Sequence, residues 1–219
     1  MFFRKRQVWL PTLWGWLALA AAAGAAAVAI ITSLYPFLAL NAPVGAKVLV
    51  VEGWLTTYEL DQAIEVFRKG GYTRVVTTGG PLHTWPEPVV DSTFAHRAAD
   101  YLKTHGLGDV AVVPAPSPIT EQDRTFHSAL MVRDQVRAWA RSGEEVRSLD
   151  VVSRGPHARR SRHLYQLAFG DEAKIGVLAV HPLGYDERHW WRSSNGARDV
   201  LEQAVGLAWV ACFFHPPQR

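Results

Sequence analysis

The stretch KVLVVEGW at positions 47–54 decides the fold, because it is a continuous apolar run that ends in a glutamate and a glycine. An apolar run without polar alternation is typical of a strand that is buried on both faces of a parallel sheet. Thr56 and Glu59 follow at the spacing of a helix capping box, and an amphipathic pattern then continues to Gly70 and Gly71. The sequence therefore predicts a strand followed by a helix.

The same unit recurs along the rest of the chain. Further strands are predicted at 74–78, 110–114, 149–153 and 175–180, and further helices at 91–105, 125–141, 156–169 and 194–214. This alternation predicts an α/β, Rossmann-like three-layer fold with a mainly parallel sheet of about five strands. If the strand order is 3-2-1-4-5, the strands at 47–54 and 149–153 are neighbours at the point where the order reverses, and ligands bind there beyond the strand ends.

A long uncharged segment precedes this domain. Positions 8–40 contain no charged residue and no histidine, and the part between Pro11 and Pro36 would form a helix of roughly 36 Å, enough to cross a hydrocarbon core of about 30 Å. We predict a short cytoplasmic N-terminus and a transmembrane anchor over residues 1–40, and an extracytoplasmic domain over 41–219. A long cleaved signal peptide is the alternative, because small residues near 39–42 suit a cleavage site.

Charge placement supports the membrane interpretation and argues against nucleic acid. The formal net charge of +3 equals the charge of Arg4, Lys5 and Arg6, which precede the apolar segment. The domain is therefore neutral, so a nucleic-acid partner is not expected. By the positive-inside rule, the N-terminus lies in the cytoplasm and the domain lies outside the cytoplasmic (inner) membrane.

Several kinds of site are excluded by what the sequence contains. The single cysteine, Cys212, excludes an intramolecular disulfide framework and a multi-cysteine metal site, and the histidines show no metal-ligand spacing. No P-loop, G-x-G-x-x-G, H-E-x-x-H or G-x-S-x-G motif is present. We therefore predict no metal site, and the cofactor is left unknown.

Candidate functional residues follow the predicted strands. They are Glu52 and Gly53 after the first, Gly79 and Gly80 after the second, Thr125 and Ser128 in the helix start after the third, and Arg154 and His157 after the fourth. Glu52 is a candidate general base or metal ligand, although a pairing with Arg160 would explain it equally well. The two glycines after the second strand either let a ligand approach the backbone or simply form a turn. The hydroxyls of Thr125 and Ser128 either donate to a phosphate or simply cap the helix.

The richest of these elements is GPHARRS at 155–161. Positions 154–163 contain four arginines, two histidines and no acid. With Gly155 as the cap and Pro156 as the first helical residue, free N–H groups and guanidinium groups would bind phosphate or carboxylate. His157 and Arg160 share one helix face, whereas Arg159 lies on another face with His163, so only one pair is expected to meet the ligand. A solvated basic helix face is the alternative.

Four of these motifs, taken in order, resemble a known family. They are the strand that ends in Glu52 and Gly53, the turn TTGG at 77–80, the helix start RTFHSA at 124–129, and GPHARRS at 155–161. The chain is similar to the YdcF/SanA/ElyC-like family, the domain of unknown function numbered 218, over about residues 47–180. Thr78 stands where the family usually has serine, and Ser128 stands where it has asparagine. The family's acid at the start of the second helix has no clear counterpart, and Asp91 is the nearest.

The resemblance implies a membrane-anchored protein of the bacterial envelope, linked to envelope integrity and to peptidoglycan or lipid-carrier metabolism. Two functions stay open. In one, the protein is an enzyme that acts on a phosphorylated or pyrophosphorylated, lipid-linked precursor, with Glu52 or His157 as acid or base and with Arg159 or Arg160 holding phosphate. In the other, it is a non-catalytic module that binds a nucleotide or another anion and regulates envelope assembly.

The last predicted helix also has two interpretations. Its final part, 205–214, is apolar nearly all round but is too short to cross a bilayer. It either closes the sheet as a buried helix, or it rests on the membrane surface beside Trp190 and Trp191. A third function, binding to other envelope proteins through this helix, follows from the same residues.

Overall fold

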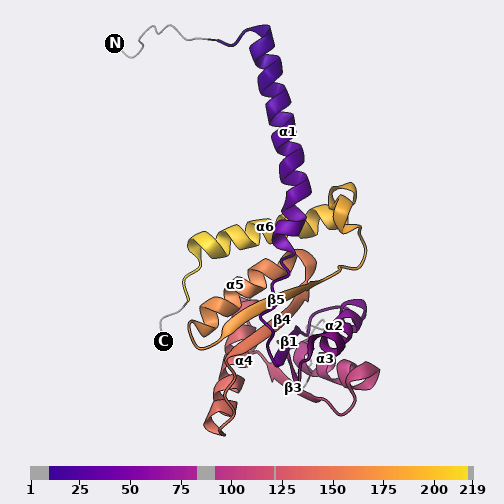
Figure 1. The fold of residues 1–219 in the computed structure, drawn as a ribbon, viewed down its shortest axis with the longest axis vertical. Helices are drawn as coiled ribbons and strands as arrows, with labels where there is room; N and C mark the ends of the chain where they lie inside the picture. The colour runs from indigo at the N-terminus through magenta and orange to yellow at the C-terminus, as the bar shows by residue number, and fades with distance from the viewer. Residues whose placement is uncertain (1–9, 83–91, 121, 217–219) are drawn as a thin grey trace, which may run out of the picture.

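Five parallel strands form the centre of the molecule (Figure 1). A computed structural model describes residues 10–82, 92–120 and 122–216. The strands are β1 (Val48–Glu52), β2 (Arg74–Gly79), β3 (Ala111–Pro116), β4 (Ser148–Arg154) and β5 (Lys174–Val180). Their order is β3-β2-β1-β4-β5, so β1 and β4 are neighbours at the reversal of strand order. The predicted α/β class and the parallel sheet are confirmed.

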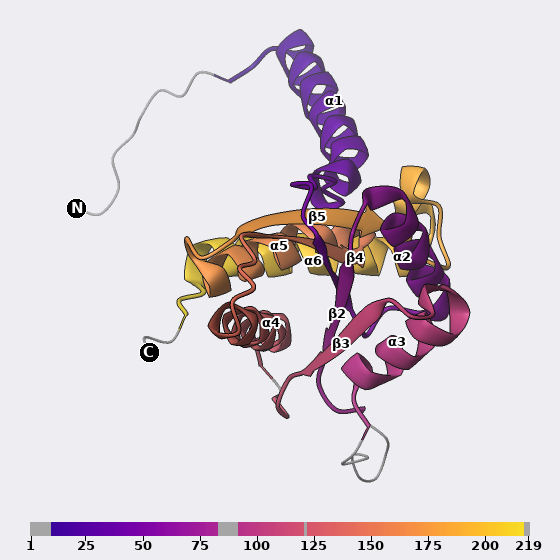
Figure 2. The ribbon, with the colours of Figure 1, turned by 60° about the horizontal axis from the view of Figure 1, so that its bottom comes forward.

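Helices cover both faces of the sheet (Figure 2). On one face lie α2 (Thr57–Gly70) and α3 (Phe94–Leu102), and on the other lie α4 (Arg124–Arg141) and α5 (Ala158–Phe169). Strand β1 serves both layers, because Val48 and Val50 pack with α4 and α5 whereas Leu49 and Val51 pack with α2 and α3. Alternate side chains of a strand point to opposite faces, so an all-apolar strand is the one that two helical layers require.

Two helix starts test the capping predictions. The capping box of Thr56 and Glu59 is confirmed, since each side chain bonds the backbone N–H of the other. Gly155 is not the helix cap that the sequence predicted: residues Gly155–His157 form a 3-10 turn, η2, and α5 begins after it at Ala158. Gly155 is instead required by packing, because a Cβ there would overlap the hydroxyl of Tyr35. The α3 start predicted at Asp91 lies outside the described residues, and Thr93 caps the helix at Phe94.

The N-terminal helix α1 (Leu13–Leu38) is long and apolar enough to cross a membrane. The prediction that it would end before Pro36 is wrong, because Pro36 lies within its last turn. That turn packs into the domain, where Tyr35 and Leu38 are buried in a cluster with Trp190 and Val200. Helix and domain are therefore joined by packed side chains.

Polar contacts secure the same junction. The Trp190 indole N–H donates to the carbonyl of Ile31 (3.1 Å), and the Tyr35 hydroxyl donates to Glu187 (3.1 Å). Trp190 and Glu187 belong to the short helix η3 (Glu187–Arg192), which follows β5. Two residues of η3 thus hold the C-terminal end of α1 against the domain.

The segment after α1 is tied to the sheet by a buried carboxylate. Asp150 of β4 has no exposed surface, and its oxygens accept hydrogen bonds from the backbone N–H groups of Val44 (2.7 Å) and Ala46 (3.1 Å) and from the Tyr72 hydroxyl (3.1 Å). Gly176 of β5 lies beside it, and a Cβ there would overlap the carboxylate. Asp150 thereby fixes the path of the chain from the anchor into β1.

The last helix, α6 (Ser194–Phe213), runs crosswise at the foot of α1 (Figure 1). The buried-helix interpretation of 205–214 is wrong, because Val205 is 70% exposed whereas Val210 is 6% exposed. Only one side of the helix packs on the domain.

Candidate functional site

A cavity of about 1050 Å³ lies where the carboxyl ends of β1, β2 and β4 meet α6. It is lined by most of the residues predicted from the strand ends. These are Glu52, Gly79, Gly80, Thr125, Ser128, Arg154, His157 and Arg160. The predicted position of the site, beyond the strands at the reversal of strand order, therefore matches the cavity.

Glu52 is part of the cavity lining and is only 2% exposed. The hydroxyls of Ser153 (2.6 Å) and Ser161 (2.7 Å) each donate to one of its carboxylate oxygens. Burial raises the pKa of Glu52 to about 7, and this effect exceeds the opposing effects of the two hydroxyls and of Arg160. The carboxyl group therefore exchanges its proton near neutral pH.

His157 stands next to Glu52, with its Nε2 atom 3.9 Å from a carboxylate oxygen. Its Nδ1 atom lies 2.8 Å from Oε1 of Gln203 in α6 and 3.0 Å from a guanidinium nitrogen of Arg160. Burial and the charge of Arg160 lower the pKa of His157 to about 3. The imidazole is thus neutral at physiological pH, so Glu52 and His157 are polar neighbours and not an ion pair.

Arg160 is the cation closest to this pair. Its Nε atom is buried, and no described residue accepts a hydrogen bond from it. The guanidinium group fits against Gly206 of α6, where a Cβ would overlap it. Burial lowers the pKa of Arg160, the charges of Glu52 and Glu202 oppose that effect, and the charge of Arg124 on the cavity wall adds a smaller lowering. The unpartnered Nε of Arg160 therefore offers a charged hydrogen-bond donor to an anion in this cavity.

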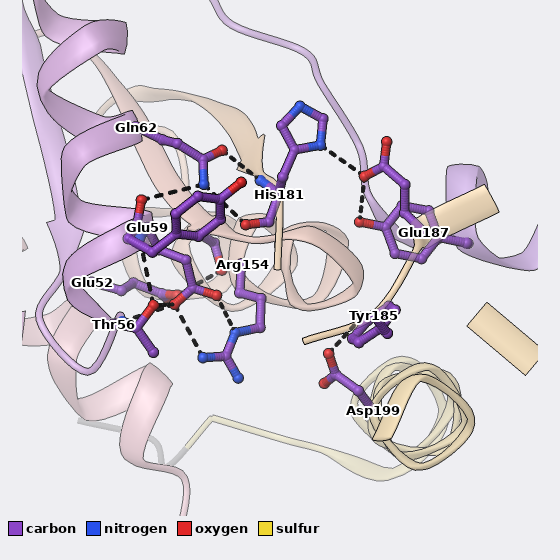
Figure 3. Close-up of polar contacts among 12 residues, drawn as sticks. Glu52, Thr56, Glu59, Gln62, Arg154, His181, Tyr185, Glu187 and Asp199 are labelled. Carbon is purple, nitrogen blue, oxygen red and sulfur yellow. Dashed lines mark hydrogen bonds and ion pairs between the residues drawn. The ribbon is translucent and has the colours of Figure 1, made fainter. Parts of the chain in front are cut away.

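Arg154 also lines the cavity, but its charge is already compensated. Its guanidinium donates two hydrogen bonds to the carboxylate of Glu59, at 2.6 and 3.0 Å (Figure 3). It also lies 5.0 Å from the ring centroid of Trp54. Arg154 therefore braces α2 against the end of β4, and Arg160 is better placed to receive an anion.

No family model matches this chain, and no match to a curated protein was found. The site is therefore interpreted from its own geometry and chemistry.

Two of the predicted ligand-binding residues lie elsewhere. Gly53 lies outside the cavity lining, and a Cβ there would overlap the carbonyl oxygens of Thr78 and Phe94, so this glycine lets the end of β1 pack against β2 and α3. Arg159 points toward the anchor, where it donates to the carbonyl of Phe37 and lies 4.0 Å from the centroid of that ring. Of the two predicted basic pairs, the pair of His157 in η2 and Arg160 in α5 faces the cavity.

The smaller predicted side chains are in the cavity wall. Thr125 Oγ1 lies 3.5 Å from His157 Nε2, and the Ser128 hydroxyl lies 3.5 Å from that of Ser117. Gly79 adopts a φ of 136°, which L side chains rarely adopt. These groups shape the wall and add hydroxyl donors to it.

Sequence reasoning missed three residues that set the chemistry of the site. Ser153 and Ser161 bind Glu52, and Gln203 contacts His157 from a helix far along the chain. The sequence did hold a signal for two of them. Ser161 is part of the basic motif, and Gln203 is a polar residue in a helix that becomes apolar. Their partners depend on the helix packing, which spacing alone does not fix.

The cavity does not present a cluster that is typical of a metal centre. Within residues 10–82, 92–120 and 122–216, no group of three or more His, Cys, Asp or Glu side chains is placed to hold a metal ion.

Proposed function

We propose that this protein is a membrane-anchored protein of the cell envelope that binds a phosphorylated or other anionic ligand in the cavity at the β1 and β4 ends. The observation that carries the proposal is Arg160, whose guanidinium group lines the cavity and whose buried Nε has no acceptor among the described residues. Beside it lie a neutral imidazole and a carboxyl group of raised pKa. An anion would supply the acceptor that this Nε lacks.

The same site supports acid or base catalysis on such a ligand. A group transfers protons best when its pKa lies near the working pH, and the pKa of Glu52, about 7, meets this condition. His157, with a pKa of about 3, stays neutral and acts as a hydrogen-bonding partner that lies between Glu52 and Thr125. The proposed enzyme acts on a phosphate or pyrophosphate group of a lipid-linked envelope precursor of peptidoglycan or lipid-carrier metabolism.

The alternative function is a non-catalytic nucleotide- or anion-binding module that regulates envelope assembly. It is favoured by the contacts of Glu52, because both of its oxygens already accept serine hydroxyls and little of its surface is exposed. The two functions require the same anion site and differ in whether bound ligand is turned over.

The placement in the envelope rests on α1 and on the charge before it. A retained anchor in the cytoplasmic membrane, with the domain outside, agrees with the basic residues Arg4, Lys5 and Arg6. Cleavage near residues 39–42 would remove Tyr35 and Leu38 from the cluster that they share with Trp190, and this burial supports retention. Membership of the YdcF/SanA/ElyC-like family is part of the same proposal and rests on the strand-end motifs.

Thermal unfolding of the full chain in detergent tests the anion site. Phosphate, pyrophosphate, sugar phosphates and nucleotides are each added to the wild type, to Arg160→Ala and to Arg159→Ala. A ligand at about 100 times its Kd stabilises the native state by about 2.7 kcal/mol. We expect Arg160→Ala to weaken binding about 10- to 100-fold, because hydrogen bonds to a charged group contribute about 1.5–3 kcal/mol.

Arg159→Ala is the matched control, because it removes an arginine one position away that faces the anchor. We expect this variant to keep the ligand-induced stabilisation of the wild type. Equal losses in the two variants, or no stabilisation of the wild type by any of these anions, would contradict the proposed site.

Gly206→Ala tests whether α6 positions Arg160. The added methyl group would displace the guanidinium, so we expect the affinity for the same anion to fall by about tenfold or more while the fold is retained. Alanine is the better helix former by about 1 kcal/mol, so destabilisation of the helix does not account for a loss. In an Arg160→Ala background the methyl group has nothing to displace, and the two effects should then not add. Additive losses would count against the positioning role.

A further inference from the structure

One side of α6 is apolar and uncovered in the structure. Leu201 is 52% exposed, Val205 is 70% exposed, and Ala208 and Cys212 are exposed at the same helical spacing. We call these four residues the α6 stripe. Trp209, which is 47% exposed, flanks it.

The α6 stripe lies away from the buried sides of the helix, although Val205 also borders the cavity. Gln203 and Val210 are buried on another side of the helix, toward the cavity and the core. A third side, with Val200 and Ala204, packs against the last turns of α1. The sheet lies on the far side of α6 from the direction in which α1 extends (Figure 1). The stripe is therefore free on the side toward which the anchor projects.

The length of α1 places the bilayer surface at this level. Its 26 residues span about 39 Å, whereas a hydrocarbon core is about 30 Å thick, so about six residues lie outside the core. Those residues match the last turns, where Tyr35 and Leu38 are buried in the domain, while the side chains upstream to Ile31 are mostly exposed. The bilayer surface then falls near Ile31, whose carbonyl accepts the indole N–H of Trp190.

The short helix η3 at this level has the composition of a membrane-interface segment. Trp191 is exposed between Arg188 and Arg192, which are also exposed. The two acidic residues at the start of η3 already have partners, since Asp186 contacts His189 and Glu187 contacts His181. Exposed tryptophan and arginine together suit a bilayer interface with anionic headgroups.

We propose that the α6 stripe and η3 rest on the lipid surface, so that the domain contacts the bilayer at a second place besides its anchor. The occupant of the stripe is the acyl-chain boundary of the leaflet, and the arginines of η3 contact anionic headgroups. The inference requires α1 to span the bilayer, but it does not require the cavity to bind an anion. Val205 and Trp209 line the cavity as well, which brings its mouth to the lipid surface.

The single cysteine makes a direct test possible. The full chain is labelled at Cys212 with a nitroxide and reconstituted in vesicles of phosphatidylcholine with phosphatidylglycerol. Electron paramagnetic resonance then measures collisions of the label with oxygen, which concentrates in lipid, and with a nickel complex, which stays in water. We expect more oxygen and less nickel contact at Cys212 than at Ser142→Cys in a Cys212→Ala background.

Ser142 is the matched control, because it is exposed between α4 and β4 and so lies at the amino ends of the strands, opposite the cavity. Val28→Cys in the same background reports whether α1 is in lipid. If Val28 is in lipid but Cys212 collides with nickel as often as Ser142, the surface contact is overturned while the anchor stands. Dipolar broadening between labels at Cys212 would also overturn it, because the stripe would then join two copies of the chain. If the label at Val28 is in water, both the membrane anchor and the second contact with the bilayer are overturned.

Discussion

Asp150→Ala is expected to lower the free energy of unfolding by about 3–5 kcal/mol. The substitution leaves the buried N–H of Ala46 and the buried Tyr72 hydroxyl without their acceptor, and each such loss costs about 1–3 kcal/mol. The part-buried N–H of Val44 also loses its acceptor. Urea unfolding of the full chain in detergent, followed by tryptophan fluorescence, measures the change. A loss of this size is a large part of the stability of an ordinary domain.

A control and a double mutant make the test specific. Asp171→Ala removes an exposed carboxylate and should change stability by less than about 0.5 kcal/mol. Gly176→Ala should also destabilise, because its methyl group would overlap the Asp150 carboxylate, and part of that loss should disappear once Asp150 is alanine. If Asp150→Ala costs no more than Asp171→Ala, the buried carboxylate does not hold the linker.

Glu52→Gln is expected to stabilise the fold above pH 7 and to abolish turnover if the protein is an enzyme. Burial raises the pKa of Glu52 to about 7 from an unfolded value near 4.5, so the folded state holds its proton more tightly. The contribution of this group to stability is therefore complete below pH 4.5 and is lost as the pH rises through 7. Glutamine carries no charge, so its advantage grows from less than about 1 kcal/mol near pH 5 to about 3 kcal/mol at pH 8.

Thermal unfolding at a series of pH values measures this difference, and release of phosphate from the ligands that bind measures turnover. Glu172→Gln is a control of opposite sign, since the Arg137 guanidinium lowers the pKa of that carboxyl and its removal should cost stability as the pH rises. An unchanged difference between pH 5 and pH 8 for Glu52→Gln would contradict the raised pKa. If Glu52→Gln still turns over the ligand, Glu52 is not the catalytic acid or base. If the wild type binds the ligand without turnover, the protein is a binding module.

The sequence predicts the layers of this fold because mainly apolar strand segments alternate with amphipathic helices, and the limits of α2 in particular are marked by recognisable residues. Thr56 and Glu59 start α2 and Gly71 ends it, so local chemistry alone sets those limits. Where tertiary packing decides, local rules fail. Pro36 lies inside α1, and Gly155 serves the contact with Tyr35 and not a helix cap.

The candidate site is predictable to the same extent and for the same reason. Parallel strands bring their carboxyl ends to one edge, so Glu52, Gly79 and His157 meet in one cavity as expected. The rotation of α5 about its axis is not encoded in spacing, and only packing shows that Arg160 faces the cavity and Arg159 the anchor. The contact of Gln203 with His157 spans 46 positions of sequence, so no local pattern could have revealed it.

The packed junction between α1 and the domain also limits where the cavity can reach. A domain on a flexible linker of about ten residues would range over roughly 17 Å, because such chains span about 5–6 Å times the square root of their length. Here Tyr35, Leu38 and Trp190 lock the helix to the fold, and Asp150 fixes the chain that follows. With α1 in a bilayer, the cavity would therefore keep one position relative to the helix axis, and its height above the lipid would change only as far as the helix itself tilts or shifts. Such a site meets only ligands that lie close to the membrane surface.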